Sequence, residues 1–145
     1  MIVNIIGQPG SGKSTLAEEL KKRIAEIHKE HTVIIIDGDI VRKVSNNFDY
    51  SNTARRINIS FAYRIAESLE NAGKIDQSFK PIILIALVSP YLDLREELKR
   101  NQQVIEVFLK SSRDVRVQNH VANYEKPVSN FIPIMEDCAN FGYLY

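Results

Sequence analysis

Residues 7–14 read Gly-Gln-Pro-Gly-Ser-Gly-Lys-Ser, a glycine-rich segment that ends in a lysine and a hydroxyl side chain. This spacing, G-x-x-x-x-G-K-[ST], is typical of a loop that wraps the phosphates of a nucleoside triphosphate. Glycine permits the close approach and positive φ angles that such a loop needs, and the following helix N-terminus adds partial positive charge. We therefore predict triphosphate binding by all nine residues Gly7, Gln8, Pro9, Gly10, Ser11, Gly12, Lys13, Ser14 and Thr15.

The last residues of this segment have the side chains that chemistry would use. We expect the ammonium group of Lys13 to reach the β- and γ-phosphates as a catalytic cation, and the hydroxyl of Ser14 to ligate Mg²⁺. Thr15 is a candidate contact to the α-phosphate. The alternative is a glycine-rich turn that binds nothing. An apolar run precedes the motif and an amphipathic segment follows it, which favours the phosphate loop.

A second candidate site is Asp37-Gly38-Asp39, which follows the apolar run 33–36. One carboxylate at such a position is expected near Mg²⁺ or its water shell. The other is able to accept the proton of a hydroxyl group that is being phosphorylated. Because Asp-Gly pairs also favour plain turns, spacing alone leaves the two interpretations equally open.

Short apolar runs alternate along the chain with amphipathic segments. They predict strands at 2–6, 33–36, 82–88, 104–109 and 131–134, and helices at 14–30, 40–45, 53–72, 92–101 and 112–122. Gly73 is expected to end the third helix. This alternation predicts an α/β fold of the P-loop NTPase type, with three layers and a parallel sheet of about five strands flanked by helices. Residues 1–145 are expected to form a single P-loop kinase domain.

Two of these helices have apolar side chains at helical spacing, the pattern of an amphipathic helix with one face toward a core. These side chains are Leu16, Leu20, Ile24 and Ile27 in the first helix and Ile57, Phe61, Ile65 and Leu69 in the third. Ligands of parallel α/β sheets bind beyond the carboxyl ends of the strands. We therefore expect Gly7, Asp37 and Ser89 to meet at one edge of the sheet.

Composition excludes several classes of function. The chain has 145 residues, 44% of them apolar, and a net charge of +1, so no bulk electrostatic field indicates nucleic acid or an acidic membrane. Its single cysteine, Cys138, is expected to be structural. The longest apolar run, 82–88, is far shorter than the roughly 20 residues that span a bilayer, and no signal-peptide pattern is present. We expect a soluble, cytoplasmic protein.

Beyond the phosphate loop, the sequence resembles the adenylyl-sulfate kinase family. The resemblance continues through D-G-D-I-V-R (37–42), D-Y-S-N-T-A-R-R-I-N-I (49–59), V-S-P-Y-L-D-L-R (88–95) and I-E-V-F (105–108). Four ordered motifs with matching gaps make the likeness specific. It implies ATP and Mg²⁺ as cofactors, and transfer of the terminal phosphoryl group to the ribose 3′-hydroxyl of adenosine 5′-phosphosulfate.

The resemblance also implies roles for residues on the acceptor side. Asp39 is the implied catalytic base for the acceptor hydroxyl, with Asp37 near the metal and the acceptor. Ser89 is an implied catalytic position, a substrate contact and possible phosphoserine, although a plain strand-ending turn would also explain it. The implied acceptor-binding set is Asp37, Asp39, Arg42, Tyr50, Arg55, Asn58 and Ser89. Tyr50 stands where the family has a phenylalanine that stacks on a base.

The resemblance weakens after Phe108. The family's lid and its N-F-T-G segment are missing, Asn119 stands where the lid arginine is expected, and Y-E-x-P returns at 124–127. Adenine recognition is then weaker or supplied otherwise, for example by a partner subunit in a homodimer. One alternative acceptor is cytidine diphosphoramidate, phosphorylated at the same ribose position in capsule-precursor synthesis. A further alternative is a degenerate module that binds ATP without turnover. We expect His120 to be an ordinary surface residue. We expect the aromatic side chains of Phe131, Phe141, Tyr143 and Tyr145 to pack on the core or on a dimer mate.

Overall fold

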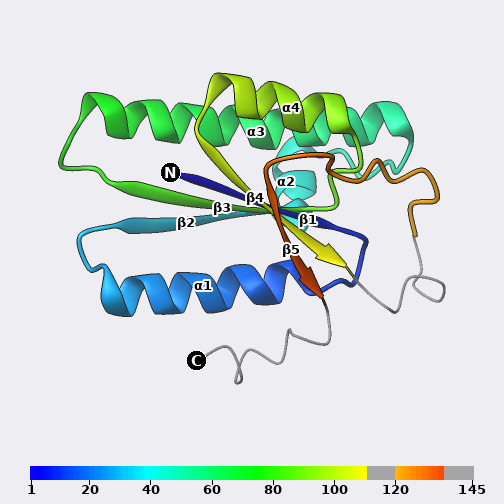
Figure 1. The fold of residues 1–145 in the computed structure, drawn as a ribbon. Helices are drawn as coiled ribbons and strands as arrows, with labels where there is room; N and C mark the ends of the chain where they lie inside the picture. The colour runs from blue at the N-terminus through cyan, green and yellow to red at the C-terminus, as the bar shows by residue number, and fades with distance from the viewer. Residues whose placement is uncertain (111–119, 136–145) are drawn as a thin grey trace.

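A five-stranded parallel sheet forms the centre of the protein, with helices on both faces (Figure 1). The computed structural model describes residues 1–110 and 120–135. The strands are β1 (Ile2–Gly7), β2 (Thr32–Asp37), β3 (Pro81–Leu87), β4 (Val104–Lys110) and β5 (Phe131–Met135), in the order β2-β3-β1-β4-β5. The helices are α1 (Lys13–Ile27), α2 (Gly38–Ser45), α3 (Asn52–Ile75) and α4 (Leu92–Asn101). The predicted three-layer α/β fold is confirmed.

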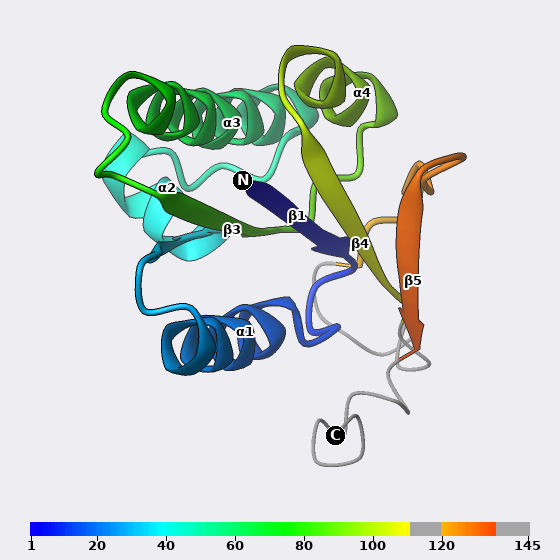
Figure 2. The same ribbon diagram turned by 60° about the vertical axis from the view of Figure 1, so that its left-hand side comes forward.

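Strand β3, which lies between β2 and β1, explains why two helical layers are needed. All seven of its residues are buried, so side chains that alternate along the strand must be covered on both faces of the sheet. One face, with Ile83, Ile85 and Leu87, packs against α3 and α4, while Ile82, Leu84 and Ala86 on the other face pack against α1. Figure 2 shows the two layers on opposite sides of the sheet.

Strand register brings the expected strand ends together. Ile6 of β1 is paired with Leu87 of β3, and Asp37 of β2 is paired with Ala86. Gly7, Asp37 and the turn after β3 therefore lie along one edge of the sheet, as the sequence predicted for a parallel arrangement. Helix α2 begins directly after β2, at this edge.

The apolar stripes on the helices are buried less completely than their spacing predicts. Ile27 at the end of α1 is 71% exposed, and Ile57 in α3 is 55% exposed. A stripe that steps by four residues rotates by about 40° per step around a helix of 3.6 residues per turn. Only the later part of the α3 stripe, Ile65 and Leu69, therefore packs against the core. The buried residues of this helix are Ala54, Asn58, Ile59, Ala62, Tyr63 and Ala66.

Gly73 does not end the third helix as predicted, because α3 continues to Ile75. A Cβ atom at Gly73 would lie 2.5 Å from Cδ of Pro81, the first residue of β3. The glycine is needed for this close approach of helix to strand. Helix α1 also ends earlier than predicted, at Ile27.

The predicted helix at 112–122 falls largely outside the described residues, which resume at His120; residues 120–122 are not helical. Asn119, Cys138 and the aromatics Phe141, Tyr143 and Tyr145 also lie outside them. Among residues 1–110 and 120–135, no helix is long and apolar enough to cross a membrane.

Candidate nucleotide-binding site

The loop between β1 and α1 has the backbone that its glycines predict. Gly10 and Gly12 adopt φ angles of 76° and 89°, a region that L-residues with side chains rarely occupy. At Gly7, a Cβ atom would lie 2.7 Å from the carbonyl oxygen of Leu109 and 2.8 Å from Oγ of Ser11. The loop therefore folds tightly against the end of β4, and only glycine fits at its first position.

The N-terminus of α1 is open to an anion. Gly12 occupies the N-cap position, where no side chain caps the helix, and the first turn contains no acidic residue. The first backbone N–H groups of a helix have no partner within the helix, and the helix dipole favours negative charge there. A phosphate chain fits this end, and the tight loop before it supplies the close backbone approach.

Lys13, the first residue of α1, is buried beneath the loop. Its Nζ donates to the carbonyl oxygen of Gln8 at 2.7 Å and to Oγ of Ser11 at 3.5 Å. Burial lowers the pKa of Lys13 to about 8, and the nearby charge of Asp37 opposes that shift. A cation held by two neutral oxygens in a desolvated position is ready to exchange them for phosphate oxygens.

Ser14 and Asp37 join the phosphate loop to the second strand. The hydroxyl of Ser14 donates to Oδ2 of Asp37 at 2.5 Å, and Oδ1 of Asp37 accepts from the backbone N–H of Asp39 at 2.9 Å. Asp37 is thus the N-cap of α2 as well as a partner of the loop. Two oxygens that converge in this way fit the hard oxygen preference of Mg²⁺. Within the described ranges, no group of three or more histidine, cysteine or acidic side chains is placed to hold a metal, so phosphate oxygens would complete such a site.

A cleft of about 300 Å³ extends from the phosphate loop across the ends of β2 and β3. It brings together every residue that the sequence assigned to the acceptor side, from three separate parts of the chain. Its polar and aromatic lining consists of Lys13, Ser14, Asp37, Asp39, Arg42, Tyr50, Arg55, Asn58 and Ser89. Of the remaining predicted loop residues, Pro9 and Gly10 line the cleft. Gln8 turns its side chain elsewhere, toward Val121.

Arg42 and Tyr50 form one wall of the cleft. The guanidinium carbon of Arg42 lies 4.2 Å from the centroid of the Tyr50 ring, and Nη1 donates to the carbonyl oxygen of Asp49 at 3.2 Å. Tyr50 is 53% exposed, so a planar group could stack on its free face. The side chain of Asp49 accepts from both the N–H and the hydroxyl of Ser51, the N-cap of α3, and these bonds lower the pKa of Asp49.

Asn58 is buried and already bonded on both polar atoms. Its Oδ1 accepts from the hydroxyl of Ser45 at 2.8 Å, and its Nδ2 donates to the carbonyl oxygen of Asn47 at 3.0 Å. The amide thereby fixes the connection between α2 and α3. Arg55, one turn earlier on the same helix, has the opposite character, because its buried Nε has no hydrogen-bond partner among residues 1–110 and 120–135. An unpaired buried donor on a cation is costly without a ligand.

Ser89 lies in the turn that follows β3, with a φ angle of 41°. It is fully buried, and its hydroxyl is 2.6 Å from the hydroxyl of Tyr63. Nδ2 of Asn4 donates to the same tyrosine hydroxyl at 3.0 Å. Burial raises the pKa of Tyr63 to about 12, so the phenol remains neutral. This chain of polar groups holds the cleft-lining turn in a backbone conformation that non-glycine residues rarely adopt.

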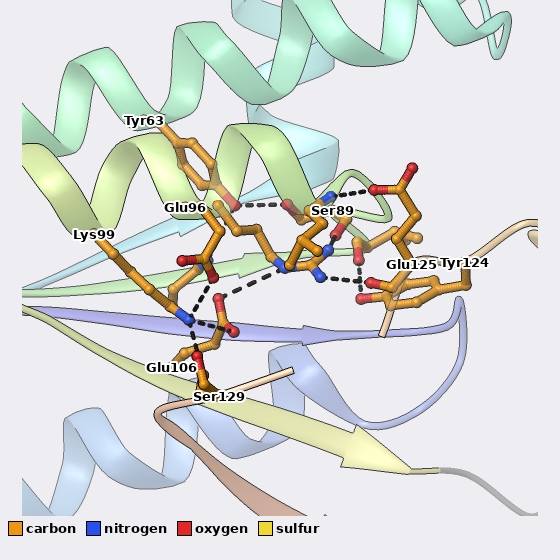
Figure 3. A network of polar contacts seen from close by, with 12 residues as sticks. Tyr63, Ser89, Glu96, Lys99, Glu106, Tyr124, Glu125 and Ser129 are labelled. Atoms are coloured by element: carbon orange, nitrogen blue, oxygen red, sulfur yellow. Dashed lines mark hydrogen bonds and ion pairs between the residues drawn. The ribbon is translucent and has the colours of Figure 1, made fainter. Parts of the chain in front are cut away.

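Arg95 of α4 connects this turn to the late part of the chain. It is fully buried, its Nη1 donates to the carbonyl oxygen of Ser89 at 2.6 Å, and its Nη2 donates to that of Glu125 at 2.5 Å. Its Nε lies 3.6 Å from Oε2 of Glu106, whose Oε1 is 3.0 Å from Nζ of Lys99. These ion-pair contacts are part of the network in Figure 3. Burial raises the pKa of Glu106.

The Y-E-x-P segment is explained by this network. The hydroxyl of Tyr124 donates to the carbonyl oxygen of Val88 at 2.5 Å. The backbone N–H of Glu125 donates to the carbonyl oxygen of Pro90 at 3.0 Å. The Glu125 carboxylate accepts from the N–H of Leu92 at 2.6 Å, at the first residue of α4. The segment therefore fastens residues 120–130 to the end of β3 and to α4 (Figure 3).

Several residues of this site were missed from the sequence, although two of them left a signal. Asn4 and Glu106 interrupt the apolar runs 2–6 and 104–109, where a buried polar group must have a partner. Tyr63 and Arg95 gave no such signal, because both lie on amphipathic helices where polar residues are ordinary.

A parallel sheet whose first strand ends in a glycine-rich loop around a helix N-terminus defines the class of P-loop nucleotide-binding proteins. Within that class, the family model described as adenylylsulphate kinase matches residues 1–130. This chain therefore belongs to the adenylylsulphate kinase family, as its motifs predicted.

Individual relatives agree with this assignment. A probable adenylyl-sulfate kinase of Pyrococcus abyssi is 30% identical over 116 residues, which cover 79% of this chain and 62% of that protein. The adenylyl-sulfate kinase of Vibrio parahaemolyticus is 34% identical over 113 residues, 75% of this chain and 51% of that protein. The chain thus spans about half to three fifths of the length of these relatives.

Solved structures share the fold. The Mycobacterium tuberculosis APS kinase CysC, in complex with AMPPNP and APS, superposes with a TM-score of 0.76 at 20% identity, covering 94% of this chain and 88% of that one. The hexameric APS kinase of Thiobacillus denitrificans gives a TM-score of 0.68 at 25% identity, covering 99% of this chain and 27% of that one.

Proposed function

We propose that this chain is an ATP-dependent kinase domain that phosphorylates the ribose 3′-hydroxyl of adenylyl sulfate. The observation that supports this proposal is the single cleft in which Lys13 and Ser14 of the phosphate loop face Asp39, Arg42 and Arg55. A protein that only bound ATP would not need a second, cationic half of the cleft beside its phosphate loop. The family, with relatives named adenylyl-sulfate kinase, supports the same acceptor.

In this proposal the transferred phosphoryl group moves between the two halves of the cleft. The bond from the acceptor 3′-oxygen to the γ-phosphorus forms while the bond from that phosphorus to the β–γ bridging oxygen breaks, leaving ADP. A carboxylate oxygen of Asp39 accepts the proton of the acceptor hydroxyl. Lys13 stabilises the charge that develops on the phosphate oxygens. Nearly all of the catalysis is positioning and electrostatics, because the protein forms no covalent bond to the phosphorus.

The cofactor and acceptor contacts follow from the same geometry. Ser14 and Asp37 are the residues that would hold Mg²⁺, which when bound neutralises charge on the β- and γ-phosphates. The forked guanidinium groups of Arg42 and Arg55 are suited to the phosphosulfate group. Tyr50 offers a free aromatic face for the acceptor base. Ser89 acts through the backbone of its turn, because its hydroxyl is buried against Tyr63.

The test is a coupled assay of ADP release from MgATP with adenylyl sulfate, with the phosphorylated product identified by mass spectrometry. We expect ADP release that depends on adenylyl sulfate and yields the 3′-phosphorylated product. Cytidine diphosphoramidate is assayed in parallel as an acceptor with a different base. ATP binding with no ADP formed in the presence of either acceptor would show a module that binds nucleotide without turnover, and would refute the proposal.

A further inference from the structure

Gln8 makes contacts with two different parts of the molecule. Its side-chain amide forms a pair of hydrogen bonds with the backbone of Val121, from Nε2 to the carbonyl oxygen at 2.8 Å and from the Val121 N–H to Oε1 at 3.0 Å. Its own carbonyl oxygen accepts from Nζ of Lys13 at 2.7 Å and from the N–H of Ser11 at 3.2 Å. One residue of the phosphate loop therefore holds both the buried lysine and a segment that is distant in sequence.

Val121 belongs to the wall of a second hollow, separate from the phosphate loop and about 440 Å³ in volume. One side of this hollow is the start of α3 with Tyr91, and the other is the segment from His120 to Asn123. The far end of that segment is anchored at Glu125, which bonds to Pro90, Leu92 and Arg95. The near end is held by Gln8, so the position of this wall depends on the Gln8–Val121 contact.

Arg55 connects the second hollow to the catalytic cleft, because its side chain lines both. Its buried Nε has no hydrogen-bond partner in the part of the chain that the structure describes, whereas the neighbouring Arg56 is engaged by Asp93 at 2.9 Å and by the ring of Tyr91. Of these two arginines, Arg55 is therefore the one that, within the described part of the chain, has a donor available for a ligand. The space around it is set partly by a wall that Gln8 keeps in place.

We propose that Gln8 is a positioning residue for the acceptor: by holding residues 120–123 it sets the acceptor-side space around Arg55, without touching the acceptor. The inference rests on the proposed kinase function for the identity of the acceptor. In this proposal the backbone and the side chain of Gln8 have different roles. The backbone serves the phosphate loop and the side chain serves the acceptor half of the site. Removing the side-chain amide leaves ATP binding intact and weakens acceptor binding.

The test compares the unsubstituted protein with Gln8→Met, which keeps the chain length and loses both hydrogen bonds. The matched control is Gln103→Met, at an exposed position before β4 and at the opposite edge of the sheet. We expect the KM for adenylyl sulfate to rise by about tenfold in Gln8→Met, as loss of two hydrogen bonds implies. The KM for ATP should stay within about threefold, because the backbone carbonyl of Gln8 that holds Lys13 is kept, and Gln103→Met should change neither KM.

Two further readouts separate this inference from the kinase assignment. Calorimetric titration of adenylyl sulfate in the presence of ADP measures acceptor affinity without turnover, and amide hydrogen exchange measures protection of the Val121 N–H. Weaker acceptor binding with faster exchange at Val121 and unchanged ADP affinity supports the role, even if no phosphate is transferred and the proposed function fails. Equal weakening of ADP and adenylyl sulfate binding, or unchanged acceptor affinity despite faster exchange, overturns it.

Discussion

The hydroxyl of Ser14 donates to Oδ2 of Asp37 at 2.5 Å, so the start of α1 and the end of β2 present converging oxygens beside the phosphate loop. We expect Asp37→Asn to raise the Mg²⁺ concentration for half-maximal activity roughly ten- to hundredfold, the usual effect of disturbing a metal's ligand environment. Asparagine still caps a helix, so α2 should persist. A magnesium titration of activity, with circular dichroism as the fold control, checks this; an unchanged requirement would remove Asp37 from the metal site.

Lys13→Met should weaken ATP binding and reduce turnover by about two orders of magnitude or more, because a charged hydrogen-bond donor to the phosphates is lost. The fold should survive, since removal of a buried, desolvated cation relieves a cost. Lys22→Met, on the exposed surface of α1, is the matched control. Isothermal titration with ATP and the ADP-release assay measure the two effects. Turnover equal to that of the control would contradict the phosphate-loop assignment.

The low pKa of Lys13 has a consequence for stability. The side chain has a pKa of about 8 in the folded protein against 10.5 for the free group, so between these values the unfolded chain binds more protons. The free energy of unfolding therefore rises with pH across that window. We expect the stability of the unsubstituted protein, relative to Lys13→Met, to increase from about pH 7.5 to about pH 10 in urea unfolding. A difference that is constant or falls with pH would contradict the desolvated lysine.

Asp39→Asn tests the proposed base. Asparagine cannot accept the hydroxyl proton, so kcat should fall by about a hundredfold or more, while ATP affinity stays within about threefold because the exposed Asp39 carboxylate does not contact the phosphate loop in the described residues. Single-turnover kinetics and ATP titration separate the two. A loss confined to ATP binding would argue against the role of Asp39 in proton transfer.

The buried pair of Arg95 and Glu106 predicts a non-additive stability effect. Arg95→Met leaves the Glu106 carboxylate buried near Lys99 alone, and we expect a loss of about 3–5 kcal/mol in the free energy of unfolding. The double variant Arg95→Met/Glu106→Leu should recover much of this loss, because no unpaired charge remains. Arg56→Ala, which breaks an exposed pair with Asp93, should cost less than about 1 kcal/mol. Equal losses in the single and double variants would contradict the ion-pair explanation.

How far the fold could be predicted depended on whether a signal was local. The five strands were found because doubly covered strands read as short apolar runs, and the phosphate loop was found because its glycines, Lys13 and Ser14 are contiguous. The prediction that Ile57 faces the core was wrong, since the spacing of apolar residues identifies a helix but does not say which part of the helix faces the sheet. The prediction that Gly73 ends the helix was wrong, because glycine is favoured both at helix ends and where a helix closely approaches another element. Here the close approach of Pro81 requires it.

The sequence by itself determined the phosphate loop, the alternation of strands and helices, and the candidates Asp37 and Asp39, because each rests on residue type at short spacing. The family resemblance added Arg55. Tertiary structure alone decided which side-chain atoms are free: Arg55 Nε has no partner among the described residues, while Oδ1 and Nδ2 of Asn58 are each hydrogen-bonded. It also decided the contact between Gln8 and Val121, which are 113 residues apart. Hydrogen bonds between distant residues depend on how the strands and helices pack, and no local pattern of side chains encodes that.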